Sequence, residues 1–167
     1  MPSPKFWIES VDLAARIVSA FERGNSHYET LAEFAWLRRL GTRLMEQQLT
    51  LLMTVNLEKL TGARHWVNIA INPSDGTILY GDSMHAIIPE NLHEAYTWWL
   101  KQHSPASISL DKYPISPQMD GHSCGILTNN AHHHFVDPNC KLVQGNEPIR
   151  EHLRNFNLIA DHVVQRV

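Results

Sequence analysis

Two apolar stretches near the middle of the chain are separated by a four-residue turn signal, and this pattern most limits the possible folds. The segments HWVNIAI (65–71) and GTILYGD (76–82) are typical of strands, with NPSD between them. They predict an antiparallel hairpin in which residue 71 faces 76, 69 faces 78, 67 faces 80 and 65 faces 82. Directly opposed residues share one face of a sheet, so one apolar face would contain Ile69, Ile78, Val67 and Tyr80.

Helical patterns flank this hairpin on both sides. Ser10 is a suitable N-cap for a helix that reaches Phe21, and Gly24 ends it. Further helices are expected at 27–40, ending before Gly41, at 90–103, from Cys124 onward and from Asn146 onward; further strands are expected at 49–56 and 106–112. The order of helices, then strands, then helices favours an α+β fold, in one domain covering residues 1–167.

Composition and charge exclude several classes of function. The formal net charge of −3 gives no electrostatic case for nucleic-acid binding. No apolar run approaches the roughly 18 to 20 residues that span a bilayer, so no membrane partner is expected. The N-terminal MPSPKFWIES lacks the basic and apolar blocks of a signal peptide. Two cysteines make no disulfide framework, which favours an intracellular location, nucleus or cytoplasm.

The open end of the predicted hairpin brings an imidazole and a carboxylate together. His65 would lie opposite Asp82, with Cβ atoms about 5 Å apart. A carboxylate beside an imidazole holds one tautomer and stabilises the imidazolium, which suits a general base. Taken alone, the pattern fits a surface pair without a function at a strand end better than it fits a catalytic pair.

The segment QMDGHSCG (118–125) places a thiol where a helix should begin. Unpaired backbone N–H groups and the positive end of the helix dipole favour a thiolate at Cys124. The same N–H groups could hold a developing oxyanion, with the Gln118 amide as a second donor. Together with His65 and Asp82, these residues form the set needed for acyl transfer by a cysteine nucleophile.

These motifs resemble those of the ubiquitin-like-protein-specific cysteine proteases, the SUMO protease group related to the adenovirus endopeptidase. The family pattern is H-W, a following D-S, and Q-x-D-x-x-x-C-G. Here His65-Trp66, Asp82-Ser83 and QMDGHSCG match it. The segments ILYGDSM and DGHSCGILTNNAHH look most like a fungal branch associated with transposon-derived genes. The resemblance covers about residues 7 to 160 and implies a papain-like fold with a central mixed or antiparallel sheet flanked by helices.

The resemblance also implies a substrate tunnel. The family opens with W-L-x-D before its first helix, and FWIES supplies Trp7 and Ile8, with Ser10 in place of the capping Asp. In the family, that Trp lies over the substrate's C-terminal Gly-Gly. Trp7 and Trp66 are therefore the expected substrate-binding residues.

The implied reaction is hydrolysis of a peptide or isopeptide bond after the C-terminal glycine of a ubiquitin-like modifier. Cys124 would be the nucleophile, His65 the proton carrier oriented by Asp82, and Gln118 an oxyanion donor, with a thioester intermediate. Asp120 is expected to organise its loop. No cofactor or metal is expected. The partner would be a SUMO-type or NEDD8-type modifier or its conjugates, with SUMO favoured, and the enzyme would be a monomer.

Three alternatives remain open. A related group uses the same fold and a His-acid-Cys set as an acetyltransferase, and a non-catalytic module could bind a modifier without cutting it. A metal-binding module is suggested by the run His132–His134 and by Cys140. Consecutive helical positions point about 100° apart, so the run cannot ligate one ion from a regular helix. Cys140 is expected to be a structural thiol.

Overall fold

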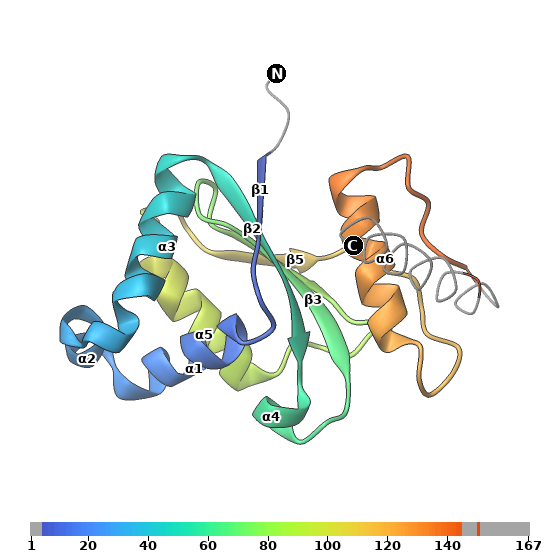
Figure 1. Ribbon diagram of the computed structural model, residues 1–167, viewed down its shortest axis with the longest axis horizontal. Helices are drawn as coiled ribbons and strands as arrows, with labels where there is room; N and C mark the ends of the chain where they lie inside the picture. Colours follow the sequence, from blue (N-terminus) through green and yellow to red (C-terminus); the bar gives the residue numbers. More distant parts are fainter. Residues whose placement is uncertain (1–4, 145–149, 151–167) are drawn as a thin grey trace, which may run out of the picture.

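A computed structural model of the protein describes residues 5–144 and residue 150 (Figure 1). The predicted helix from Asn146 onward lies outside these residues, apart from residue 150. In chain order the elements are β1 (Lys5–Ile8), α1 (Leu13–Arg23), α2 (Asn25–Thr30), the 3-10 helix η1 (Ala32–Phe34), α3 (Ala35–Glu46), β2 (Leu49–Asn56), α4 (Glu58–Thr61), β3 (Trp66–Asn72), β4 (Thr77–Gly81), α5 (Glu90–Lys101), β5 (Ser109–Lys112) and α6 (Cys124–Val136).

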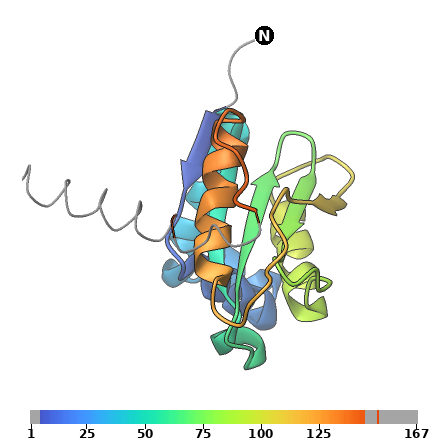
Figure 2. The same ribbon diagram turned by 90° about the vertical axis from the view of Figure 1, so that its right-hand side faces the viewer.

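The strands form one mixed sheet in the order β1-β2-β3-β4-β5. The inner pairs β2–β3 and β3–β4 are antiparallel, and both outer pairs are parallel. Helices α1, α2, α3 and α5 lie on one side of the sheet and α6 lies on the other (Figure 1), where it runs along the sheet (Figure 2). The predicted α+β fold, with a central mixed sheet flanked by helices, is confirmed. Within the described residues, no helix has the length and apolar character to cross a membrane.

Five of the eight residues of strand β2 are apolar, including three in a row, because both of its faces are covered. Leu51 and Met53 point into the larger core beneath α1, α3 and α5. Leu52 points the other way, into a smaller core with Ala70 and the α6 residue Ala131. Alternate residues of a strand face opposite sides, so a strand between two layers reads as a continuous apolar run. The predicted strand at 49–56 is therefore confirmed.

The hairpin is present, but its predicted register is wrong by two residues. Ile69 pairs with Tyr80 rather than with Ile78, and Ile78 pairs with Ile71. A slip of one residue would have turned one strand over, whereas a slip of two keeps every side chain on its face. The predicted apolar face therefore survives: Val67, Ile69, Ile78 and Tyr80 all lie in the larger core.

The hairpin loop explains the shift. Asn72 and Thr77 are the last paired residues, and the side chain of Asn72 donates to Oδ2 of Asp75 at 2.9 Å. Gly76 has a φ of 74°, in the left-handed region, and its N–H donates to the Asn72 carbonyl. A glycine adopts this conformation without steric cost. The loop therefore closes one residue later than the sequence NPSD predicted.

The helix predicted at 27–40 is wrong at its start and its end. The chain turns to extended backbone at Leu31, which separates α2 from η1, and α3 then continues through Gly41 to Glu46. A Cβ at Gly41 would lie 2.2 Å from the ring of His103. This glycine therefore permits close packing against the segment that follows α5, and it does not end a helix.

The predicted cap at Ser10 is also wrong. Helix α1 begins at Leu13 after Asp12, and no side chain caps it. Ser10 contributes only its backbone: its carbonyl accepts from the Leu13 N–H, and its own N–H donates to the carboxylate of Glu9. Gly24 does end the helix, with a φ of 79°.

Candidate active site

An imidazole–carboxylate pair lies at the ends of two central strands. His65 immediately precedes β3 and Asp82 immediately follows β4. Nε2 of His65 lies 2.7 Å from Oδ1 of Asp82, with the two side chains 10% and 3% exposed. The two-residue register shift means that these residues are not directly opposed. Both residues lie beyond the last pair of β3 and β4 at this end, and their side chains reach across the two-residue offset.

The carboxylate of Asp82 is held by two further donors. The N–H of Met84 donates to Oδ1 at 2.6 Å, and the Tyr80 hydroxyl donates to Oδ2 at 3.3 Å. Burial, then the neighbouring Asp82 charge, raises the pKa of Tyr80, so its hydroxyl stays protonated and available as a donor. The sequence analysis missed Tyr80 as a partner of Asp82. Its position two residues earlier in a strand, on the same face, was a usable signal.

Cys124 is the first residue of α6, and its helix start is open. Ser123 occupies the N-cap without a side-chain hydrogen bond to the helix. Within the part of the chain that the structure describes, the N–H of Cys124 forms no hydrogen bond. Such an N–H group at a helix N-terminus can stabilise negative charge. The thiol therefore lies beside a backbone donor suited to an oxyanion.

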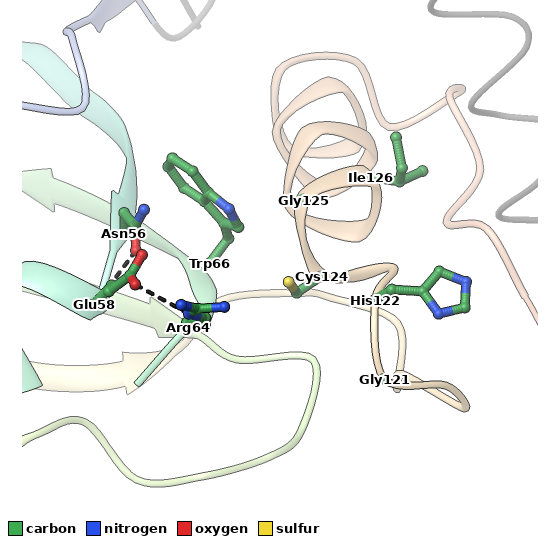
Figure 3. Close-up of a pocket in the computed structure, with 9 residues that line it drawn as sticks. All are labelled: Asn56, Glu58, Arg64, Trp66, Gly121, His122, Cys124, Gly125 and Ile126. Atoms are coloured by element: carbon green, nitrogen blue, oxygen red, sulfur yellow. Dashed lines mark hydrogen bonds and ion pairs between the residues drawn. The ribbon is translucent and has the colours of Figure 1, made fainter. Parts of the chain in front are cut away.

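A cavity of about 320 Å³ lies in front of this thiol. In Figure 3 the Cys124 sulfur points across it toward Arg64 and Trp66, and the ring of His122 points away. The full lining is Asn56, Glu58, Arg64, Trp66, Gly121, His122, Cys124, Gly125 and Ile126. Nε of Arg64 donates to Glu58 at 3.1 Å on the rim. The sequence analysis missed this exposed pair, because no motif includes it.

Two contacts bring β3 and α6 together at the cavity. A methyl group in place of the Gly125 hydrogen would lie 3.8 Å from Cδ1 of Trp66. Nδ2 of Asn68 donates to the carbonyl of Thr128 at 2.9 Å. The residue after the imidazole thus lies beside the residue after the thiol. No hydrogen bond joins His65 to Cys124 among the described residues, an arrangement common in unliganded sites.

The loop before α6 is organised by Asp120. Oδ1 of Asp120 accepts from the backbone N–H groups of His122 and Ser123, and Oδ2 accepts from the Ser123 hydroxyl at 2.6 Å. The hydrogen bond from the Ser123 side chain is the largest cause that lowers the pKa of Asp120 to about 2. This carboxylate therefore sets the path of the chain into Cys124, as expected for a loop organiser.

Gln118 is held between two loops. Its Nε2 donates to the Asp120 carbonyl at 2.6 Å, and its Oε1 accepts from the Ser83 hydroxyl at 3.0 Å. Gln118 is not among the residues that line the 320 Å³ cavity. Its amide is near the helix start through Asp120 but is not aimed into the cavity, so its role as an oxyanion donor stays a prediction.

The structure does not bring Trp7 and Trp66 together. Trp7 pairs with Leu51 and so lies on the sheet face away from α6, where the Arg43 guanidinium is 4.1 Å from its ring centroid. Trp66 lies on the α6 face and lines both the 320 Å³ cavity and a second one of about 80 Å³. Trp7 lines neither, and a role for it in substrate binding stays a prediction.

In the run His132–His134 on α6, His132 and His134 contact different partners. His132 contacts the Tyr113 hydroxyl through Nδ1 and Thr54 through Nε2, and burial lowers its pKa to about 4. Nδ1 of His134 donates to the carbonyl of Cys140 at 2.7 Å. Among residues 5–144 and 150, no group of three or more His, Cys, Asp or Glu side chains is arranged to hold a metal ion.

No family model matches the sequence, and no curated protein matches it. Several solved structures are similar to it. The C-terminal Ulp1 protease domain in complex with Smt3, the yeast ortholog of SUMO, is 17% identical with a TM-score of 0.57 over 89% of this chain and 64% of that one. The SUMO protease Ulp1 with its catalytic cysteine oxidised to a sulfonic acid is 16% identical, with a TM-score of 0.48 over 84% of this chain and 70% of that one. The ASFV pS273R protease is 18% identical, with a TM-score of 0.41 over 59% of this chain and 41% of that one.

The first of these likenesses carries the fold assignment. It covers most of this chain, which spans less than two thirds of the Ulp1 chain. At this identity it bears on the fold and not on the reaction, and the fungal branch stays a prediction. The protein therefore has the fold of the ubiquitin-like-protein-specific cysteine proteases, as its motifs predicted.

Proposed function

We propose that this protein is a cysteine protease or isopeptidase that cleaves after the C-terminal Gly-Gly of a ubiquitin-like modifier, with a SUMO-type modifier favoured. The observation that carries the proposal is the 2.7 Å contact between Nε2 of His65 and Oδ1 of Asp82. His65 and Asp82 do not themselves line the 320 Å³ cavity, but Arg64 and Trp66, the neighbours of His65, line it together with Cys124 at its helix start. The fold shared with a Ulp1 domain that was solved in complex with Smt3 supports the choice of modifier.

The tautomer of His65 follows from its partner. A carboxylate at neutral pH only accepts hydrogen bonds, so Nε2 carries a proton toward Asp82. Nδ1 is then the nitrogen that exchanges a proton with the thiol. In the proposed reaction the Cys124 thiolate attacks the glycyl carbonyl, and Nδ1 of His65 returns the proton to the leaving amine. Water then hydrolyses the thioester, with His65 as the base.

The cavity supports a requirement for glycine in the substrate. A Cβ on Gly125 would already contact the indole of Trp66 at 3.8 Å, so the cavity wall at these two residues leaves little room for a side chain on a substrate residue that passes beside them. The backbone N–H of Cys124 is one proposed oxyanion donor, and Nε2 of Gln118 is the second. The 3.4 Å contact of Gln118 Nε2 with Oδ1 of Asp120 would give way to the oxyanion when substrate binds.

A panel of modifiers with C-terminal electrophiles tests the proposal. SUMO, a NEDD8-type modifier and ubiquitin, each ending in Gly-vinyl sulfone, would be incubated with the protein. We expect a covalent adduct with the SUMO probe on Cys124, none with Cys124→Ala and full labelling with Cys140→Ala. Absence of any adduct, while iodoacetamide still alkylates Cys124, would contradict the proposed function.

Two further measurements separate the alternatives. Transfer of radiolabelled acetyl from acetyl-CoA, without hydrolysis of a SUMO C-terminal aminomethylcoumarin amide, would identify an acetyltransferase. Binding of SUMO without hydrolysis of that amide would identify a non-catalytic module. We expect the protease to act as a monomer without a cofactor, in the nucleus or cytoplasm.

A further inference from the structure

Ser83 links the two loops that carry Asp82 and Gln118. Its side chain and backbone are buried, at 1% exposure. The Ser83 carbonyl accepts from the backbone N–H of Gln118 at 2.7 Å. The Ser83 hydroxyl donates to Oε1 of the same residue at 3.0 Å. One serine therefore holds both the backbone and the side chain of Gln118.

The direction of these hydrogen bonds follows from chemistry. The other end of the Gln118 amide faces the carbonyl and the carboxylate of Asp120, at 2.6 and 3.4 Å. Both of these groups only accept hydrogen bonds, so the end that faces them must be the NH₂ group. Oε1 therefore faces Ser83, whose hydroxyl must donate. Without that hydroxyl, nothing on the Ser83 side would favour oxygen over nitrogen.

We propose that Ser83 is a positioning residue, which orients the Gln118 amide so that an N–H can reach the oxyanion formed at Cys124. The inference rests on the proposed function. One N–H of Gln118 is engaged at 2.6 Å, whereas the 3.4 Å contact of the other is weak and can be exchanged for an oxyanion. Because Ser83 is the neighbour of Asp82, the acid and the oxyanion donor are positioned by two successive residues.

A double-mutant cycle tests this route. The substrate is the SUMO C-terminal aminomethylcoumarin amide. Loss of one oxyanion donor lowers kcat by about 10² to 10³, so we expect that range for Gln118→Ala. Ser83→Ala misplaces the donor without removing it, and we expect a fall of about tenfold in kcat with KM unchanged. In the Gln118→Ala background, Ser83→Ala should have no further effect.

Control variants separate positioning from general damage. Ser116 is a buried serine on the loop before Gln118, and its side chain forms no hydrogen bond with the described residues; Ser116→Ala should leave kcat unchanged. Ser83→Thr keeps the hydroxyl and should restore most of kcat. If Ser83→Ala does not fold, Ser83→Cys keeps the volume with a weak donor and should show the same loss.

The rate of Cys124 alkylation by iodoacetamide separates Ser83 from its neighbour Asp82. Alkylation forms no oxyanion, so Ser83→Ala should leave its rate and pH profile unchanged. A shifted profile would show that Ser83 acts through Asp82 and His65, and would overturn the proposal. An equal loss of kcat in the wild-type and Gln118→Ala backgrounds would also overturn it.

One readout does not depend on turnover. The two side-chain N–H signals of Gln118 in a ¹⁵N NMR spectrum, assigned with Gln118→Ala, should be dispersed and protected from exchange. Ser83→Ala should shift them toward the values of a free amide, in part only because the hydrogen bond to the Asp120 carbonyl remains, and unchanged signals would contradict the proposal. If the wild-type protein cleaves no modifier, the proposed function fails, and this spectrum still decides whether Ser83 orients Gln118.

Discussion

The two halves of the candidate site are held by different kinds of structure. His65 and Asp82 lie at the ends of adjacent central strands and are almost fully buried. Gln118 and Asp120 lie on a loop in which Met119 is 77% exposed. The first half depends on the sheet and on three hydrogen bonds to one buried carboxylate. The second depends on the hydrogen bonds of Asp120, a carboxylate that is one third exposed.

This difference indicates which half is complete before substrate arrives. The imidazole and its carboxylate are already at hydrogen-bond distance. The Gln118 amide is instead bound to Asp120, and its weak 3.4 Å contact with Oδ1 must be exchanged for an oxyanion. Catalytic hydrogen bonds often tighten only when substrate binds. We therefore expect substitutions in the sheet half to affect the proton transfer, and those in the loop half to affect the stabilisation of the transition state.

The largest effect on kcat is expected from substitution of Cys124, the proposed nucleophile on which both halves of the site act. Cys124→Ala should lower kcat on the SUMO aminomethylcoumarin amide by roughly 10⁵- to 10⁶-fold, because the alanine methyl group cannot attack the glycyl carbonyl. Its circular dichroism spectrum should match the wild type. Cys140→Ala is the matched control and should retain full activity. Near-normal turnover in Cys124→Ala would break the assignment of both halves.

The sheet half should give the next largest effect. Asp82→Asn is expected to lower kcat by about 10⁴-fold, because an amide can donate to Nε2 and so favour the wrong tautomer of His65. Asp111→Asn, on the exposed edge strand β5, is the control for loss of one negative charge. An effect of Asp82→Asn below tenfold would show that the buried pair has no part in proton transfer.

The loop half should give a smaller effect. Asp120→Asn weakens the hydrogen bonds from the N–H groups of His122 and Ser123, and so disturbs the loop whose Asp120 carbonyl holds Gln118. We expect kcat to fall about 10- to 100-fold, within the cost of one oxyanion donor, with little change in the pH dependence of Cys124 alkylation. A change in that pH dependence as large as in Asp82→Asn would remove the distinction between the halves.

A few-fold effect on kcat/KM is expected from loss of the Tyr80 hydroxyl, which donates to the Asp82 carboxylate. Tyr80→Phe removes a 3.3 Å hydrogen bond to Oδ2. A neutral hydrogen bond contributes about 0.5 to 1.5 kcal/mol, so we expect kcat/KM to fall roughly 2- to 10-fold. Tyr28→Phe removes a buried hydroxyl from the remote Trp99–Tyr28–His103 network. It should lower stability but not kcat/KM, and an equal loss in both variants would contradict a specific role for Tyr80.

No effect on activity at pH 7.5 is expected from His132→Gln, but its stability profile should change. Burial lowers the pKa of both His132 and His103 to about 4, so both are neutral when folded. The unfolded chain binds more protons below about pH 6.5. The free energy of unfolding should therefore decrease as the pH falls from about 6.5 toward 4.

Urea denaturation at a series of pH values tests this expectation. The free energy of unfolding should decrease less steeply with falling pH in His132→Gln than in the wild type, and the exposed His133→Gln is the control. Equal slopes in His132→Gln and the wild type would contradict a neutral His132.

The reactive residues could be predicted because each is next to a local signal. His65 and Asp82 border strands with strong apolar patterns, and Cys124 follows a polar loop and opens a helix. The contact between His65 and Asp82 survived an error in the register, since a shift of two residues leaves every side chain on its face. The role of Ser83 could not be predicted in the same way, because it depends on a contact with Gln118, which is distant in the sequence.

Local pattern failed where a distant segment determines the conformation. Gly41 was interpreted as a helix end, yet it lies inside α3, because the ring of His103, more than sixty residues away, packs against it. The face on which Trp7 lies is also determined by a distant segment. The parallel pairing of β1 with β2 sets its side chain on the face of the sheet away from α6, and its role in substrate binding stays a prediction. Neither packing partner is visible in the neighbouring sequence.

The sequence by itself determined the chemical groups, their order along the chain and the alternation that assigns each strand residue to a face. These properties depend on bond geometry and on neighbours within a few residues. Only the tertiary structure decided which nitrogen of His65 meets Asp82, that Asp120 and Ser83 hold the Gln118 amide, and that Trp66 rather than Trp7 lines the cavity. Those outcomes depend on contacts between segments far apart in the chain, whose geometry is set when both faces of the sheet are covered.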